Sequence, residues 1–357
     1  MNAHRGTDEV LFTRQGRLGR IRLNRPRALN ALTEHMVLAM LAQLEEWTHD
    51  DRVNAVAIDG LGERGLCAGG DIRAVRQALM TGDGEAALRF WDDEYRLNAL
   101  LHGWSKPVVS VMDGVVMGGG VGISAYADLR LATERSQVAM PEVRIGFFPD
   151  VGARWLLARA PGELGTHLAL TGATATGADA VLCGLADLVV DSSRVGDVLA
   201  HLADGADLDA AAEAALAHPP TDAAARVAPL AEQRAWIDEC YAGDDAVAIV
   251  ERLHASPVEE ARAAARTIES RSPLSVAVTL AGLRRAAGMP TLEQVLDDDR
   301  ALGRAFVRGT SDGGEPAGAD FVEGVRALLV DKDHAPRWRY SSLAEVDPAE
   351  VKSLFNA

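Results

Sequence analysis

Residues 139–152 read AMPEVRIGFFPDVG, an apolar run that carries two carboxylates eight residues apart, Glu142 and Asp150. Acidic side chains are rarely buried without a partner, so two of them in such a run need a structural or a chemical reason. Burial favours the protonated form of a carboxyl group, which allows proton transfer near neutral pH. The alternative is that Glu142 pairs with Arg144 or Arg154 and that Asp150 caps the helix that follows. This stretch alone supports both interpretations about equally.

The composition indicates a globular protein. The chain has 357 residues, of which 48% are hydrophobic, enough for one large or two ordinary domains. Its net charge of −16 argues against nucleic-acid binding, which depends on clustered Lys and Arg. The sequence contains no apolar run long enough to cross a bilayer. The first 19 residues contain charged residues and no apolar stretch of signal-peptide length, so we expect no targeting segment there. The three cysteines are too widely spaced for a disulfide framework or a metal site, so we expect a cytoplasmic protein without a metal.

Two glycine-rich turns each come after a short apolar segment that is typical of a buried strand. They are GLCAGGDI (65–72) and MGGGVG (117–122). Glycine allows backbone amides to approach a ligand closely. One N–H from each turn, from Ala68 or a neighbour and from Gly119, could form an oxyanion hole, which stabilises charge on a carbonyl oxygen. A carboxylate near that carbonyl could abstract a proton, activate water or attack the carbon.

The rest of the pattern predicts a mixed α/β core followed by helices. A strand hairpin is expected within 10–23, a helix capped by Thr33 over 34–48, and a mainly helical region after about residue 200. We therefore expect a core over residues 1–200 and a helical C-terminal region over 201–357 that packs on it.

Other charged residues are ambiguous when they are considered singly. Glu94 lies among several charges on a predicted helix over 84–102, and its spacing alone indicates a solvated side chain. Arg25 and Arg27 precede the helix over 34–48 and could bind a phosphate, although solvated loop arginines are the more common outcome.

A dinucleotide-binding motif also has to be considered. GVGISA (120–125) matches the glycine fingerprint, and Glu142 follows about twenty residues later. The match overlaps three consecutive glycines, such short motifs are common by chance, and Glu142 follows a proline. We therefore disfavour a dinucleotide-binding fold.

Four segments in order carry a resemblance to a known family. LNRPRALNAL (23–32), CAGGDI (67–72), MGGG (117–120) and MPE (140–142) resemble the crotonase (enoyl-CoA hydratase/isomerase) superfamily. The resemblance implies an α/β fold, a spiral of ββα units with an extended helical C-terminal region, and an acyl-CoA ligand. It also implies that the amides of Ala68 and Gly119 hold the thioester oxygen. The CoA-binding residues that it implies are Ala68, Gly69, Gly70 and Asp71, with Arg25 and Arg27 as weaker candidates.

One departure from the superfamily pattern narrows the expected chemistry. Hydratases of this superfamily carry a second glutamate at the position of Gly122, and its absence argues against hydration. Segments 93–98, 147–152, 272–275 and 323–333, with 336–338, are instead similar to the 3-hydroxyisobutyryl-CoA hydrolase branch. That resemblance implies a substrate site formed by Glu94, Gly119, Glu142 and Asp150, and it replaces the solvated interpretation of Glu94.

The expected reaction is hydrolysis of a short hydroxyacyl-CoA thioester, with Glu142 as nucleophile or general base and Asp150 binding the substrate hydroxyl or handling protons. Coenzyme A is then part of the substrate, and no separate cofactor is expected. An enoyl-CoA isomerase of the Δ3,Δ2 type, with Glu142 as its single base, is the nearest alternative. A non-catalytic acyl-CoA-binding protein is a more distant one. A homo-oligomer is possible.

Overall fold

The computed structural model describes residues 8–217, 219–309 and 316–356. We expected no targeting segment in residues 1–19. Of these, residues 1–7 lie outside the described range. The chain forms two compact units, each assembled from separate segments. The first unit comprises residues 1–70, 93–139 and 174–229, and the second comprises 71–92, 140–173 and 230–357. The sequence predicted a single boundary near residue 200, whereas both units take segments from either side of that position.

All the strands of the described residues belong to the first unit. They are β1 (Val10–Gln15), β2 (Leu18–Leu23), β3 (Ala55–Gly60), β4 (Val108–Met112), β5 (Val115–Met117), β6 (Leu129–Thr133), β7 (Gln137–Ala139), β8 (Ala175–Thr176) and β9 (Leu188–Val190). Six of them form one sheet in the order β1-β2-β3-β4-β6-β9, in which only the β1–β2 pair is antiparallel. The other three form a small sheet in the order β5-β7-β8.

The helices are divided between the two units. Those of the first unit are α1 (Glu34–Thr48), α4 (Gly119–Gly122), α7 (Gly177–Leu182), α8 (Val195–Ala203) and α9 (Leu208–Leu216), and α3 (Gly84–Gly103) contributes residues to both. Those of the second are α2 (Ile72–Met80), α5 (Ala153–Leu157), α6 (Leu164–Thr171), α10 (Pro229–Cys240), α11 (Ala246–Ala255), α12 (Glu259–Glu269), α13 (Pro273–Ala287), α14 (Leu292–Arg308), α15 (Ala319–Val325) and α16 (Pro348–Leu354). The predicted helical C-terminal region is confirmed as a series of helices.

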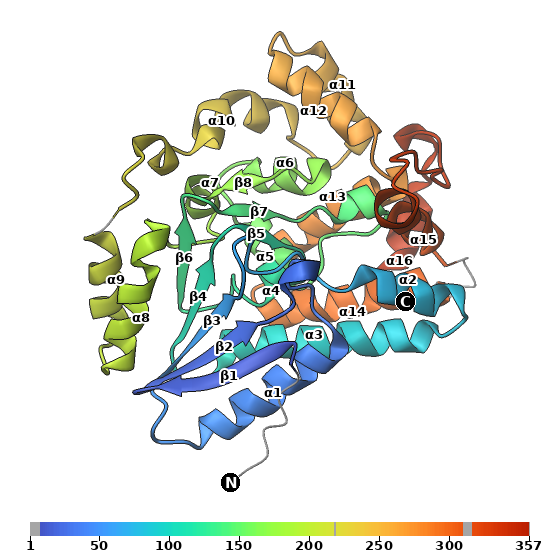
Figure 1. Ribbon diagram of the computed structural model, residues 1–357. Helices are drawn as coiled ribbons and strands as arrows, with labels where there is room; N and C mark the ends of the chain where they lie inside the picture. The colour runs from blue at the N-terminus through green and yellow to red at the C-terminus, as the bar shows by residue number, and fades with distance from the viewer. Residues whose placement is uncertain (1–7, 218, 310–315, 357) are drawn as a thin grey trace. The chain divides into compact units, whose positions relative to one another are not determined.

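From β4 to β7 the strands alternate between the two sheets along the chain. β4 of the large sheet is followed by β5 of the small sheet and then by α4, and β6 is followed in the same way by β7 (Figure 1). β3 and β4, and β4 and β6, are parallel neighbours, so each repeat advances by one strand. This is the spiral of ββα units expected from the resemblance.

Local sequence explains the first elements. β1 and β2 pair from Val10 with Leu23 to Gln15 with Leu18, and the turn between them uses Gly16 at a φ of +55°. The side chain of Thr33 accepts a hydrogen bond from the amide of Met36 and caps α1, as predicted.

The core of the first unit lies between the large sheet and α8 and α9 (Figure 1). Apolar side chains of β2, β3, β4 and β6 pack against Val198, Leu199 and Leu202 of α8 and against Ala211 and Ala215 of α9. Burial of this apolar surface stabilises the large sheet, in which β3 leads to the first glycine turn.

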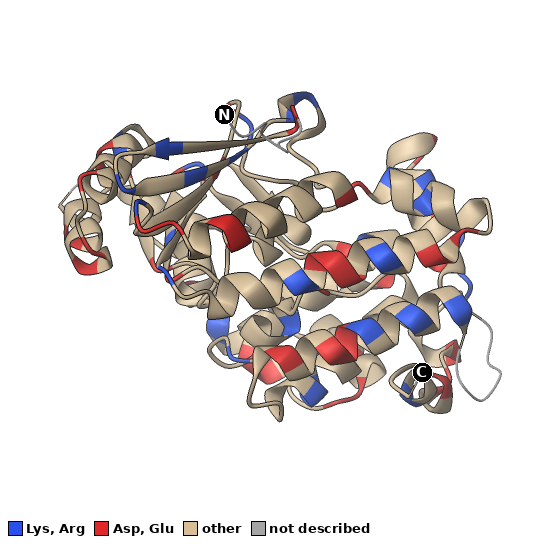
Figure 2. Ribbon diagram, turned by 90° about the horizontal axis from the view of Figure 1, so that it is seen from below, with Lys and Arg blue, Asp and Glu red and all other residues tan. Residues whose placement is uncertain are grey.

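Helix packing and polar contacts to backbone carbonyls join distant segments of the second unit. Arg73 and Arg76 of α2 donate to the carbonyls of Leu329 and Val322, at 2.9 Å each. Lys and Arg are interleaved with Asp and Glu along several helices (Figure 2). Many of these charges form short-range ion pairs, such as Arg262 with Glu259, which contribute little individually.

Candidate active site

The first glycine turn follows β3 and is held by backbone hydrogen bonds. The amide of Ala68 donates to the carbonyl of Leu29 at 3.0 Å, and the amide of Leu32 donates to the carbonyl of Gly69 at 2.8 Å. The N–H of Ala68 is therefore already engaged. Among the described residues, the amide of Gly70 has no hydrogen-bond partner, so it is the neighbour of Ala68 that can donate to a ligand.

The second glycine turn follows β5 and begins α4. Gly119 is the first residue of this short helix, where amides have no partner within the helix. Within the described ranges, no acceptor is bound to its N–H. A Cβ on Gly69 would lie 3.2 Å from the carbonyl oxygen of Met117 and 3.6 Å from the nitrogen of Gly119, so the two turns abut. Their close approach explains why both sequences are rich in glycine.

Glu94 lies directly beside the second turn. Its residue is only 2% exposed, and a Cβ on Gly119 would overlap its Oε1 atom. The first unit therefore brings Gly69, Gly70, Gly119 and a carboxylate together. The solvated position indicated by helical spacing is wrong, and the burial agrees with the interpretation taken from the resemblance.

A buried cysteine lies behind the first turn. Burial raises the pKa of the Cys67 thiol to about 12, and the thiol lies 3.4 Å from the amide of Gly69. Because the thiolate is the nucleophilic form, this cysteine is inert near neutral pH.

Glu142 and Asp150 both belong to the second unit and are both buried, at 6% exposure. Glu142 begins the 3-10 turn η2 (Glu142–Ile145), which Gly146 ends at a φ of +71°. The turn contacts the start of α13, where the amide of Ser272 donates to the carbonyl of Val143 at 3.3 Å. A Cβ on Gly146 would overlap the backbone of Asp320 on α15.

Asp320, whose backbone lies against Gly146, also contacts the start of α13. It is buried and accepts hydrogen bonds from the Ser272 hydroxyl at 2.5 Å and from the Arg339 amide at 2.8 Å. Burial raises its pKa above the ordinary value for an aspartate. It therefore ties the start of α13 to α15 behind the Glu142 turn.

Aromatic rings form an apolar cluster around the segment between the two acids. Phe147 stacks on Phe148 and on Trp91, with ring centroids 4.2 and 4.9 Å apart. Phe306 and Phe321 contact Phe147 edge-on at 5.2 and 5.6 Å. The cluster buries Phe147 and Phe148 in an apolar environment.

The surroundings of the two acids bear on their structural interpretation. Arg154, one of the two arginines considered as a partner of Glu142, forms ion pairs with Asp298 and Asp299. Helix α5 begins at Ala153 with Gly152 as its N-cap, and the amide of Ala153 donates to the backbone carbonyl of Asp150 at 2.9 Å.

Val151, next to Asp150, has a strained backbone. It is fully buried and has a φ of +51°, a conformation that β-branched residues rarely adopt. Such strain costs about 1–3 kcal/mol and persists only where the surroundings enforce it.

The predicted CoA-binding residues have different environments. The Arg25 guanidinium forms an ion pair with Glu9 at 3.0 Å and donates to the carbonyl of Ala31 at 2.6 Å, so it has a structural role. Arg27 is exposed, and Arg64, which sequence reasoning missed, is exposed beside it and donates to the carbonyls of Pro26 and Arg27. Asp71 directly precedes α2 but does not cap it with its side chain.

Sequence reasoning also missed Asn98. This residue lies one helical turn after Glu94 on α3, is fully buried, and has no hydrogen-bond partner for either side-chain amide atom among the described residues. Its only sequence signal was its place in the segment 93–98, because nothing in the helical pattern marks it.

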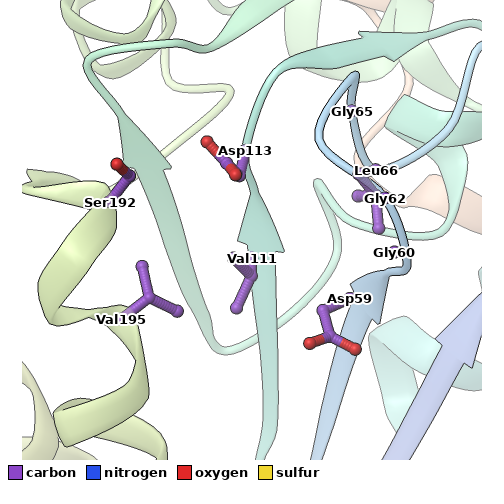
Figure 3. Close-up of a pocket in the computed structure, with 9 residues that line it drawn as sticks. All are labelled: Asp59, Gly60, Gly62, Gly65, Leu66, Val111, Asp113, Ser192 and Val195. Carbon is purple, nitrogen blue, oxygen red and sulfur yellow. The ribbon is translucent and has the colours of Figure 1, made fainter.

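A small pocket opens at the ends of β3 and β4 in the first unit (Figure 3). Two carboxylates line it, and both are neutralised: Asp59 by Arg20 and Arg22, and Asp113 by Arg135. These acids are therefore committed to ion pairs and are not candidates for catalysis.

Within residues 8–217, 219–309 and 316–356, no cluster of three or more His, Cys, Asp or Glu is arranged to hold a metal ion. No helix in the same ranges combines the length and the apolar character needed to span a bilayer.

The spiral of ββα units and the abutting glycine turns define a protein of the crotonase-fold class. The family model described as enoyl-CoA hydratase/isomerase matches residues 18–355. The chain therefore belongs to the enoyl-CoA hydratase/isomerase family, and a dinucleotide-binding fold is excluded.

Similar proteins cover nearly the whole chain. The 3-hydroxyisobutyryl-CoA hydrolase, mitochondrial, of Danio rerio is 37% identical, and the match covers 100% of this chain and 92% of that protein. The Homo sapiens protein of the same name is 35% identical, over 98% of this chain and 89% of its own length.

Two solved structures are also similar. A protein from Mycobacterium thermoresistibile described as a carnitinyl-CoA dehydratase is 44% identical, with a TM-score of 0.89 over 98% of this chain and 96% of its own. One from Rhodobacter sphaeroides 2.4.1 described as an enoyl-CoA hydratase is 39% identical, with a TM-score of 0.87 over 97% of each chain.

Proposed function

We propose that this protein hydrolyses 3-hydroxyisobutyryl-CoA to 3-hydroxyisobutyrate and CoA, a step of valine breakdown. The observation that carries the proposal is the near full-length similarity to several proteins named as 3-hydroxyisobutyryl-CoA hydrolases. The glycine turns and the three buried acids Glu94, Glu142 and Asp150 supply the groups that thioester hydrolysis needs.

The oxyanion hole in this proposal is formed by two backbone amides. Gly119 supplies one, as expected from the sequence. Gly70 supplies the other in preference to Ala68, because the Ala68 amide donates to Leu29. Negative charge that develops on the thioester oxygen is then stabilised by donors that need no rearrangement.

Glu142 carries out the central step. In one form, its carboxylate oxygen bonds to the carbonyl carbon, the C–S bond breaks, and CoA leaves as a thiolate that takes up a proton. Water then hydrolyses the resulting anhydride and regenerates the carboxylate. In the other form, Glu142 takes a proton from a water molecule, whose oxygen attacks the carbonyl carbon directly. The C–S bond then breaks, and the departing CoA thiolate takes up a proton, so that Glu142 is again a carboxylate.

Asp150 and Glu94 assist in this scheme. Asp150 binds the substrate hydroxyl or transfers the proton that the leaving thiolate needs, so the two acids hold different roles. Glu94 helps to bind the acyl group beside Gly119, which its contact with that glycine supports. Residues 68–71 bind the CoA chain, and Arg27 with Arg64 is better suited to its phosphates than Arg25 is.

The descriptions of the two solved structures favour a second candidate, hydration or dehydration of an enoyl-CoA. Gly122 argues against it, because hydratases of this superfamily place a second glutamate there. An isomerase that uses Glu142 alone remains a third candidate, and a binding protein without activity a fourth.

One experiment separates these candidates. The purified protein is incubated with 3-hydroxyisobutyryl-CoA, a 2-enoyl-CoA and a 3-enoyl-CoA, while free thiol and the conjugated enoyl absorbance are followed. A hydrolase releases thiol from the first substrate. Loss or gain of enoyl absorbance without thiol release would instead indicate a hydratase or an isomerase, and no turnover of any of them would favour a binding protein.

Location and assembly also belong to the proposal. The named relatives are mitochondrial proteins, so the comparisons do not support the cytoplasmic location expected from composition. Fractionation of the native cells, with the protein followed by antibody, tests the compartment. A homo-oligomer is tested by light scattering of the purified protein.

A further inference from the structure

The strained residue Val151 separates Asp150 from Gly152, and both Val151 and Gly152 have positive φ angles, +51° and +73°. Gly152 adopts this conformation readily, whereas a β-branched valine does not. Contacts with other residues must therefore stabilise this conformation of residues 150–152, which we call the Asp150 turn.

Asp299 on α14 provides such contacts. Its Oδ2 accepts a 2.7 Å hydrogen bond from the amide of Gly152, and its Oδ1 accepts a 3.1 Å hydrogen bond from Nε of Arg154. Arg154 and Asp299 are both fully buried. A buried ion pair is a weak source of stability but gives strong directional constraint when its geometry is satisfied.

Arg154 restrains the turn from its other side as well. Its guanidinium lies 5.6 Å from the centre of the Phe148 ring, two residues before Asp150. Space for this side chain exists because Gly282 on α13 has no Cβ, which would overlap Nη1 of Arg154. The pair therefore contacts the segment both before and after Asp150.

We propose that Asp299 and Arg154 are positioning residues that hold the Asp150 turn in its strained conformation and so fix the direction of the Asp150 carboxylate. The inference rests on the proposed function, in which Asp150 binds the substrate hydroxyl or handles protons. In this proposal, the buried pair of Asp299 and Arg154 supports catalysis through Asp150 and not by direct contact with the substrate.

The first test is Val151→Gly, which removes the strain without removing any polar contact. Glycine tolerates the positive φ, but the variant loses a fully buried isopropyl group and its unfolded chain gains freedom, so the melting temperature falls. The turn also gains freedom, and kcat falls about tenfold or more with little change in KM, because small misplacements of catalytic groups are costly. A folded variant with the kcat of the wild-type protein would overturn the proposal.

The second test compares two neighbouring aspartates that share Arg154. Asp299→Asn weakens the contact to the Gly152 amide and the pair with Arg154. The matched control is Asp298→Asn, since Asp298 accepts from Nη1 of Arg154 at 3.0 Å and from Arg285 but not from the turn. Both variants lose stability, but only Asp299→Asn lowers kcat, by about tenfold or more. Equal kcat values for the two folded variants would contradict the proposal.

Hydrogen exchange gives a readout that does not depend on the reaction. Amide protection over residues 150–154 decreases in Val151→Gly and Asp299→Asn and is retained in Asp298→Asn. If the wild-type protein released no CoA from any thioester, the proposed function would fail. The exchange data would still test whether Asp299 and Arg154 restrain the Asp150 turn. Unchanged protection in all three variants would overturn that restraint.

Discussion

Oε1 of Glu94 lies so close to the Cα of Gly119 that no Cβ fits between them. Gly119 therefore serves two purposes: its amide, the first of α4, has no acceptor among the described residues, and its lack of a side chain makes room for a buried carboxylate. This contact joins one half of the proposed oxyanion hole to an acid of the proposed substrate site.

Gly119→Ala tests this contact. The new methyl group displaces the Glu94 carboxylate and tilts the Gly119 amide, so we expect kcat/KM to fall about 100-fold or more, as for loss of an oxyanion donor. Overpacking should also cost about 1–3 kcal/mol of stability, measured by urea unfolding. The control is Gly196→Ala on α8, where a Cβ meets nothing within 4 Å. That variant should keep its activity, and wild-type activity in Gly119→Ala would contradict the assignment.

Asn98→Leu tests whether the buried amide of Asn98 has a partner. Both of its polar atoms lack one in the structure, and removing an unsatisfied buried polar group avoids a cost of about 1–3 kcal/mol. The variant should therefore be as stable as the wild-type protein or more stable, as judged by thermal unfolding. A loss of several degrees would mean that a bound water or another partner satisfies the amide.

The pair of His167 and Tyr241 predicts a pH dependence of stability. The ring Nδ1 lies 2.9 Å from the Tyr241 hydroxyl, and burial lowers the pKa of His167 from 6.5 to about 4. Below pH 6.5 the unfolded chain takes up a proton that the folded chain does not. Stability is therefore fully present above pH 6.5 and decreases as the pH falls towards 4, by up to roughly 3 kcal/mol.

His167→Gln isolates this contribution from that of the carboxylates. Urea unfolding of both proteins at pH 7.5 and pH 5 should show a smaller loss for the variant between the two values. Parallel losses would show that His167 is not kept neutral by burial.

The regular elements near the N-terminus were predictable because local signals specify them. The alternating pattern of residues 10–23 and the cap at Thr33 need only neighbours in sequence, and both predictions are confirmed. The fold was indicated by the resemblance to the crotonase superfamily, which four segments in order along the chain carry.

Other features could not be predicted because long-range packing determines them. Glu94 belongs to a helix with charges on several sides, and only tertiary structure shows that its side is buried. Asp298 and Asp299 resemble solvated helix charges until Arg154 is placed against them. The amide of Ala68 donates a hydrogen bond to the carbonyl of Leu29. Leu29 has a φ of +51°, and nothing in the sequence indicates this conformation.

Glu142→Gln tests the central claim most directly. The substitution keeps the size of the side chain but removes the carboxylate that attacks the thioester or activates water. Release of CoA from 3-hydroxyisobutyryl-CoA is measured with a thiol reagent under single-turnover conditions, with the exposed Glu45→Gln as the control. We predict that wild type and Glu45→Gln release CoA at the same rate and that Glu142→Gln is slower by about 1,000-fold or more. Full hydrolysis by folded Glu142→Gln would contradict the account.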